Sequence, residues 1–211
     1  MIPREKILVA MPVHNYMLDV ECVSGLLACA PLYHRPLFFA GHSNIAHARN
    51  IMAHTFVEKA TEYDWLMWID ADTVFKVDDW KLLWDGDEEV VVAEYAKKIL
   101  GQPPVQFGFG FTRVHRNVYE RIKALMHEDG AERVNRFYHD GQMMVDYHPN
   151  GALQSGKWIG EDQGFFMWAG MAEAKLRLET RTRLGHAGRF VYGYPDQIPG
   201  FKMVDAEDGA Q

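Results

Sequence analysis

Short apolar runs of strand length alternate with segments of helical periodicity in the first half of this chain, and this alternation restricts the possible folds more than any other feature. The apolar runs read KILVAMPV, PLFFA, DWLMWID and EVVVAEYA, at 6–13, 36–40, 64–70 and 89–96. The segments with helical spacing between them lie at 18–30, 45–63 and 77–84. Continuous apolar strands are typical of sheets covered on both faces, so the pattern predicts an α/β fold with helices on either side of a central sheet.

The pattern is less regular beyond Gly101. FGFGFTRV at 107–114 predicts a strand whose glycines allow another group to approach the backbone closely, and the amphipathic segment HRNVYERIKALMHE predicts a helix after it. No period is visible across 129–158, which predicts a long irregular loop. We then expect a helix within 158–174, a strand at LRLETRTRL and a polar tail at 200–211. The whole chain, 1–211, is interpreted as one domain.

Composition excludes several classes of protein. With 211 residues, 48% of them hydrophobic, the chain can bury a substantial core, while its net charge of −7 argues against a broad basic surface for nucleic acid. Cys22 and Cys29 share one predicted helix and are expected to be reduced core thiols. No apolar stretch reaches the ~18 residues of a membrane span, so we expect a soluble cytoplasmic protein without membrane attachment. The oligomeric state stays open.

Two carboxylates, Asp70 and Asp72, follow the apolar run at 64–70. In an open α/β sheet, ligands collect beyond the carboxyl ends of the strands, and one intervening residue lets both carboxylates reach the same ligand. Such hard oxygen donors suit Mg²⁺ or Mn²⁺, which would bridge to phosphates. Taken alone, the pair is more simply explained as a turn in which Asp side chains cap backbone amides.

A second acidic pair and a histidine complete the candidate site. Glu161 and Asp162 begin a predicted helix, where the helix dipole favours negative charge. His186 lies between glycines in RLGHAGRF, which predicts a flexible-loop imidazole with little apolar packing. Each feature alone has an ordinary explanation, as a helix N-terminal turn and as a solvated loop residue.

Taken in order, MPV-HN, ARN, WIDAD, VVVAEYAKK, GFGFTRVHRNVYERI, WIGEDQGFF and LGHAG resemble the GT-A-type glycosyltransferases. The sequence is most similar to the compact, family-2-like enzymes often encoded by bacteriophages, from about Ile7 to Tyr194. The resemblance implies a single-domain, Rossmann-like GT-A fold with a mixed, mostly parallel sheet. It also implies a nucleotide-sugar donor, with UDP as the first guess, and Mn²⁺ or Mg²⁺ as the cofactor.

The resemblance further implies roles for individual residues. Those expected to bind the nucleotide or the donor sugar are Pro12, His14, Asn15, Arg49, Asp70, Ala71, Glu94 and Tyr95. Asp72 and His186 would ligate the metal ion, with Asp70 contacting the ribose or a water of the same complex. Asp162, or less favourably Glu161, would be the base that deprotonates the acceptor, as in inverting enzymes.

The acceptor side is less well defined. Relatives often carry a bulky residue after the acidic pair, whereas Gln163 and Gly164 follow it here. A hydroxymethylated pyrimidine of phage DNA, reached as a flipped base, is one candidate acceptor. The side chains that form either a phosphate track or a solvated helix face are those of His115, Arg116, Arg121, Lys123, Arg133 and Arg136.

Aromatic residues and histidines near this side have ordinary explanations. We expect His139 and His148 at the surface of the irregular loop, and Trp168 in the core. Trp158 flanks the acidic pair, where it can stack on a sugar or a base.

Two other functions are compatible with parts of the sequence. WIDADT fits the strand end of haloacid-dehalogenase-like phosphatases, with Asp70 as nucleophile, although that motif normally follows the first strand. The chain can also be interpreted as a nucleotide-sugar-binding protein without turnover.

Overall fold

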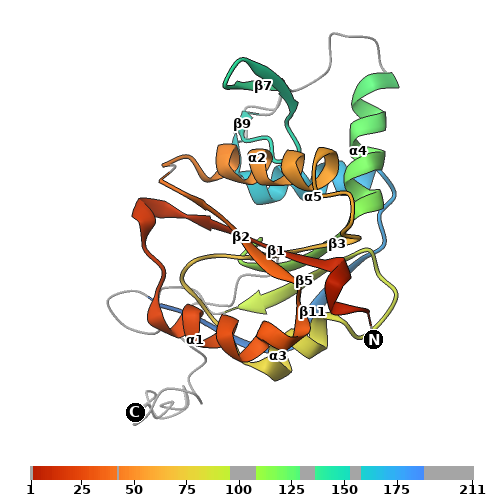
Figure 1. Ribbon diagram of the computed structural model, residues 1–211. Coiled ribbons are helices and arrows are strands. Elements are labelled where there is room, and N and C mark those ends of the chain that lie inside the picture. Colours follow the sequence, from red (N-terminus) through yellow and green to blue (C-terminus); the bar gives the residue numbers. More distant parts are fainter. Residues whose placement is uncertain (1, 42, 96–107, 129–135, 153–157, 188–211) are drawn as a thin grey trace, which may run out of the picture.

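The computed structural model describes residues 2–41, 43–95, 108–128, 136–152 and 158–187, in which helices cover both faces of a central sheet (Figure 1). One face packs against α1 (Val20–Cys29) and α3 (Val77–Leu83), and the other against α2 (Ile45–Glu58), α4 (Arg116–Glu128) and α5 (Glu161–Met171). The short 3-10 turns in these parts of the chain are η1 (Arg4–Lys6), η2 (His14–Tyr16) and η3 (Ala30–Leu32). The predicted α/β class is therefore confirmed.

Seven strands of the described residues form the main sheet, in the order β2-β1-β3-β6-β5-β11-β4. Their bounds are β1 Ile7–Val13, β2 Arg35–Ala40, β3 Trp65–Ile69, β4 Thr73–Val74, β5 Val90–Tyr95, β6 Phe111–His115 and β11 Leu176–His186. Strands β1, β2, β3, β5 and β11 run in one direction, and β6 and β4 are antiparallel to their neighbours. This mixed, mostly parallel sheet agrees with a Rossmann-like GT-A fold.

Alternating side chains of each central strand enter the two cores. On β1, Leu8 and Ala10 join the cluster beneath α2, α4 and α5, whereas Ile7, Val9 and Met11 join the cluster above α1 and α3. Full burial of a side chain such as Leu or Ile contributes roughly 1.5–3 kcal/mol. Burial on both faces explains why these strands are continuously apolar in sequence.

Strand order reverses at β1, because β2 pairs with one of its edges and β3 with the other. The loops that leave the carboxyl ends of β1 and β3 diverge at such a switch point and open a crevice between them. The η2 turn follows β1 and Asp70 follows β3, so the segments singled out from sequence meet at this edge of the sheet.

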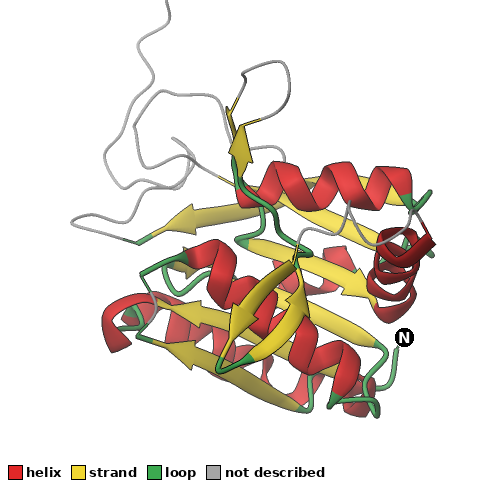
Figure 2. Cartoon of the chain, turned by 90° about the horizontal axis from the view of Figure 1, so that it is seen from above, coloured by secondary structure: helices red, strands yellow, loops and turns green. Residues whose placement is uncertain are grey.

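The second half of the chain differs in part from the prediction. Within 129–158, β7 (Arg136–His139) and β8 (Gln142–Val145) form a hairpin, and β9 (Gly151–Ala152) pairs with β10 (Trp158–Ile159). The turn residues Asp140 and Gly141 have φ of 47° and 75°, as the Asp-Gly turns that match strand twist require. The hairpin lies against α2 on the side seen from above in Figure 2.

Smaller predictions are confirmed or corrected by the same structure. Cys22 and Cys29 are buried free thiols, as expected. The structure also shows that Asn44 caps α2 by accepting a hydrogen bond of 3.1 Å from the His47 amide. The helix predicted at 45–63 ends at Glu58, and the strand predicted at 107–114 begins only at Phe111. Across the described ranges, every helix is too short or too polar to cross a membrane. The predicted tail at 200–211 lies outside the described residues.

Candidate functional site

The turn after β3 positions the first acidic pair. The Asp70 amide donates to the Gly110 carbonyl at 3.0 Å, and the Thr73 amide donates to the Asp70 carbonyl at 3.0 Å. The Thr73 hydroxyl also donates to the Gly110 carbonyl at 2.9 Å. Because backbone bonds hold the turn, the Asp70 carboxylate is not needed as a cap for these amides and can interact with other groups.

Arg49 of α2 brings Asp70 together with the second acidic pair. Its Nη2 donates to Asp70 Oδ1 at 2.8 Å, and its Nη1 donates to Glu161 Oε1 at 2.9 Å and to Asp162. The Arg49 side chain is 1% exposed, and burying a charge at this depth is costly without such partners. The two acidic pairs of the sequence therefore belong to one site.

Burial raises the pKa of Asp162 to about 6. The Arg49 guanidinium opposes this effect, whereas the negative charges of Glu161 and Asp70 add to it. A hydrogen bond from the Phe109 backbone also favours the ionised form. A carboxylate with a pKa in this range suits proton transfer near neutral pH.

Tyr95, Gly108 and Gly110 form the side of the candidate site next to Asp70. A Cβ at Gly108 would lie 2.0 Å from the Tyr95 hydroxyl, and a Cβ at Gly110 would lie 3.3 Å from Asp70 Oδ2. The predicted close approach at these glycines is therefore made by side chains of the site itself. Burial raises the pKa of Tyr95, which keeps its hydroxyl protonated. Glu94, the preceding residue of β5, is half-buried, and its carbonyl accepts a hydrogen bond from the Thr182 hydroxyl at 2.9 Å.

His186 is not the flexible-loop imidazole that the flanking glycines suggested. It is the last residue of β11, is 8% exposed, and its ring centroid lies 4.8 Å from that of Tyr95. Its backbone pairs with Thr73 of β4, and the next amide, of Ala187, donates to the Asp72 carbonyl at 2.7 Å. The expectation was wrong because the strand continues through Gly185, but the fold does bring His186 beside Asp72.

Within the described parts of the chain, no group of three or more His, Cys, Asp or Glu residues is arranged to hold a metal ion. The backbone of His186 nevertheless pairs with that of Thr73, which follows Asp72 in the turn, and Asp70 Oδ2 is not used by the Arg49 contact. The donor types suit Mg²⁺ or Mn²⁺, and the acidic side chains around Arg49 outnumber its single positive charge.

A pocket of about 250 Å³ lies where β1 ends and α2 begins. Its lining residues are Pro12, Val13, His14, Ser43, Ile45 and Ala48. Pro12 and His14 were predicted to meet the nucleotide, and both border this pocket. The side chain of Asn15 lies outside the described atoms. Ala71 follows Asp70 in the adjoining turn, where its carbonyl accepts a hydrogen bond from the Asp19 amide at 3.1 Å.

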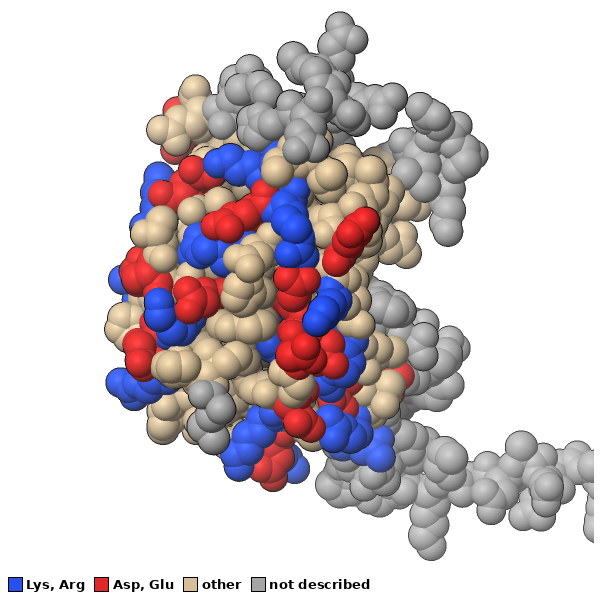
Figure 3. Space-filling view, turned by 90° about the vertical axis from the view of Figure 1, so that its right-hand side faces the viewer, with Lys and Arg blue, Asp and Glu red and all other residues tan. Residues whose placement is uncertain are grey.

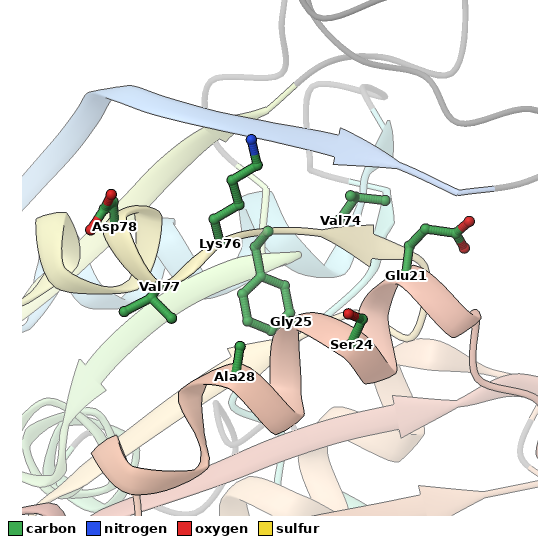
Figure 4. A pocket seen from close by; sticks show the side chains of 9 residues that line it. Glu21, Ser24, Gly25, Ala28, Val74, Lys76, Val77 and Asp78 are labelled. Carbon is green, nitrogen blue, oxygen red and sulfur yellow. The ribbon is translucent and has the colours of Figure 1, made fainter.

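A larger pocket, of about 490 Å³, lies on the other side of the sheet (Figure 4). One wall consists of the α1 residues Glu21, Ser24, Gly25 and Ala28, and the other is the segment 74–78. Figure 4 shows an open groove between α1 and the start of α3. None of the residues predicted from sequence to act in catalysis or binding lines it.

His148 was expected at a loop surface and is instead fully buried. Its ring stacks on Phe165 at 5.1 Å and meets the Phe109 ring edge-on at 4.7 Å. Neither ring nitrogen has a hydrogen-bond partner among the described atoms, and burial holds the pKa of His148 well below its usual range. His139 is also more than a surface residue, because its Nδ1 lies 3.3 Å from Nε2 of His47.

The basic residues proposed as a phosphate track are largely used within the fold. Arg116 donates to the carbonyls of Val57, Ala60 and Tyr63, Arg121 makes a bidentate pair with Glu89, and Lys123 pairs with Glu58. Burial lowers the pKa of His115. On the face that carries α4 (Figure 3), Lys and Arg alternate with Asp and Glu, so no continuous basic track is visible there. Arg133 and the Arg136 side chain lie outside the described atoms.

The packing of α5 accounts for the glycine at position 164, near the acidic pair, where relatives often carry a bulky residue. A Cβ at Gly164 would lie 2.0 Å from the Pro149 carbonyl oxygen, so the helix packs directly on that backbone. Gln163 is exposed. Trp168 packs against the core as expected, and Trp158 is 67% exposed beside the start of α5.

Asn50 is a site-supporting residue that the sequence analysis missed. Its side chain donates to Asp146 and accepts a hydrogen bond of 2.8 Å from the His148 amide, which ties the segment before α5 to α2. The available signal was the polar pair Arg49 and Asn50 within the mostly apolar helical segment IAHARNIMA, and both side chains are buried in the fold. Buried polar side chains are normally hydrogen-bonded, so such a pair indicates specific partners.

Comparison with known proteins gives the fold and little more. No protein-family model and no curated protein matches the chain. Among solved structures it is similar to A197 from STIV, with 17% identity and a TM-score of 0.54 over 94% of this chain and 98% of that one. A second match is a glycosyltransferase involved in the glycosylation of the major capsid of PBCV-1, with 15% identity and a TM-score of 0.35, over 63% of this chain and 71% of that one. The first match shows a shared fold, and the second is too distant to support an argument.

Proposed function

We propose that this protein is a metal-dependent glycosyltransferase that moves a sugar from a nucleotide-sugar donor to an acceptor hydroxyl, with inversion. One observation carries the proposal: Asp70, Glu161 and Asp162 converge on Arg49, although the second pair lies 112 and 113 residues from it in sequence. They meet at the carboxyl edge of the sheet, at its switch point, where ligands of open α/β folds bind.

The donor is assigned to the crevice between β1 and the turn after β3. The pocket lined by Pro12 and His14 is of a size to take part of a nucleotide rather than a whole nucleotide sugar, because ligand pockets span roughly 300–1,000 Å³. The base and ribose would lie there, with the diphosphate directed toward Asp70. Glu94 and Tyr95, at the end of β5, would face the sugar. UDP remains the first nucleotide to test.

Asp72, His186 and Asp70 are the residues that would hold Mn²⁺ or Mg²⁺. When bound, the metal ion would offset the negative charge that develops on the diphosphate leaving group. Among the described residues, Arg49 is the cation that contacts these carboxylates, and because it is already paired with three of them it is not available for that task.

Asp162 is assigned as the base. With a pKa of about 6 it is mainly ionised at neutral pH and accepts the proton of the acceptor hydroxyl. The acceptor oxygen bonds to the anomeric carbon as the bond from that carbon to the diphosphate oxygen breaks. A single displacement of this kind inverts the anomeric centre. Glu161 is assigned as a partner of Arg49 beside the base.

Neither alternative function gains support from the geometry. In the phosphatase interpretation Asp70 would be the nucleophile, but its Oδ1 is engaged by Arg49 and its strand is preceded by β1 and β2. A non-catalytic binding protein would use the same crevice for the donor, so turnover is the property that separates it from the enzyme.

The experiment is a screen of nucleotide sugars for Mn²⁺-dependent thermal stabilisation, followed by donor hydrolysis and transfer assays on the donors that bind. The acceptor panel should contain simple saccharides and a DNA duplex with hydroxymethylated pyrimidines. Asp162→Asn should retain donor affinity and lose transfer. Binding without sugar release over hours would favour the binding protein, and hydrolysis of p-nitrophenyl phosphate would favour the phosphatase.

A further inference from the structure

The environment of Arg49 differs from that expected of a residue that contacts the nucleotide. Its side chain is 1% exposed, whereas those of its three carboxylate partners are 20% to 26% exposed. The carboxylates therefore lie between the guanidinium and solvent. Both Nη atoms are engaged by these carboxylates, and the buried guanidinium offers little surface to a donor phosphate.

The guanidinium joins two elements that are otherwise separate in sequence. Nη2 contacts Asp70 at the end of β3, and Nη1 contacts Glu161 and Asp162 in the first turn of α5. The guanidinium is planar, with its donors in a fixed fork, so these bonds set the separation of the two carboxylate groups. The Phe109 ring, whose centroid lies 5.3 Å from Arg49 Cζ, supports the group from one side.

We propose that Arg49 is a positioning residue for the transfer reaction: it holds Asp162 of α5 at a fixed distance from the Asp70 end of β3, and it does not contact the donor. This proposal rests on the proposed function. It replaces the role in nucleotide binding that the sequence resemblance implied for Arg49. Without the guanidinium, three like charges would face one another and α5 would lose its ionic contact with β3.

Arg49→Lys is the first test, because lysine keeps the charge but has no fork that spans both elements. We expect kcat to fall by about 10²-fold, as small misplacements of a catalytic group can cause, while KM and the calorimetric Kd for the donor stay within about threefold. Arg121→Lys is the matched control, since Arg121 also makes a bidentate carboxylate pair, with Glu89 at the start of β5, away from the site. That control should retain kcat.

Two results would overturn the proposal. An unchanged kcat in Arg49→Lys would show that positioning does not depend on the fork. A donor Kd weakened as much as kcat/KM, with kcat retained, would assign Arg49 to donor binding. The wild-type protein in the same assays tests the proposed function separately, because absence of transfer there rejects that function whatever the variants do.

A second variant covers the case in which Arg49→Lys does not fold. Glu161→Gln keeps Arg49 and removes one of its two α5 carboxylates, so we expect a smaller loss of kcat, about tenfold, at unchanged donor affinity. A wild-type kcat in this variant would contradict the proposal. A loss as complete as that of Asp162→Asn would instead make Glu161 the base, which the proposal excludes.

Discussion

Replacement of Asp162 by Asn should stabilise the protein at neutral pH. Burial is the main reason why the folded protein raises the pKa of this group from 3.8 to about 6. Folding therefore favours the protonated carboxyl of Asp162. The resulting contribution to the free energy of unfolding is fully present below pH ~4 and is lost as the pH rises through about 6. Asparagine resembles the protonated form and cannot ionise, so the variant avoids this loss.

The magnitude follows from the size of the shift. A change of about two units, at 1.36 kcal/mol per unit, gives up to ~3 kcal/mol in favour of the variant at pH 7 and little difference at pH 4. The attraction of Arg49 is already contained in this figure, because it opposes the larger effect of burial. Such a gain on removing a group with a proposed catalytic role is the usual trade between stability and activity.

Urea unfolding of both proteins at a series of pH values between 4 and 8 measures the difference. Asp78→Asn is the control, since Asp78 also lies in the first turn of a helix but its side chain is 92% exposed. We expect that control to change the free energy of unfolding by less than about 0.5 kcal/mol at every pH. An Asp162→Asn protein that is less stable than wild type at pH 7, or a difference that does not grow with pH, would refute the reasoning.

Three further predictions concern the same site. If Asp162 is the base, kcat should fall by roughly tenfold between pH 7 and pH 5, because the ionised fraction drops through its pKa of about 6; a flat profile would exclude it. Asp72→Ala should abolish Mn²⁺-dependent nucleotide binding in calorimetry, and an unchanged affinity would remove Asp72 from the ligand set. Gly108→Ala should destabilise the protein by about 1–3 kcal/mol in urea unfolding, because its Cβ would meet the Tyr95 hydroxyl at 2.0 Å. Gly170→Ala, with nothing within 4 Å, is the matched control and should stabilise α5 by up to about 1 kcal/mol; equal effects of the two substitutions would contradict the assigned packing.

The buried strands could be predicted from sequence because their environment leaves a local trace. Ile7–Val13 and Val90–Tyr95 are covered on both faces, so their residues are apolar without interruption. The two-residue strand Thr73–Val74 leaves no such trace, because it exists only through its pairing with β11. The hairpin at Arg136–Val145 does have a local signal, the Asp140-Gly141 turn. The signal was missed because the surrounding sequence is polar and has no regular period.

The positions of two candidate-site residues could be predicted from sequence, but the contact that joins them could not. Asp70 and Asp162 follow a strand and begin a helix, positions that local patterns reveal. Both are bonded to Arg49, which lies 21 positions from Asp70 and 113 positions from Asp162 in the sequence. No periodicity encodes such a pairing. His148 was misjudged for a related reason, since a polar neighbourhood in sequence says little about burial in an aromatic cluster.

The pairing of β4 with β11 has a consequence for synthesis on the ribosome. Residues 73 and 74 emerge early, but their partners, Gly185 and His186, are made more than a hundred residues later. The α5 carboxylates that pair with Arg49 are likewise synthesised late. A nascent chain that already contains the first three strands still lacks β11, which pairs with the acidic turn, so the protein acquires its proposed activity only after translation has passed Ala187.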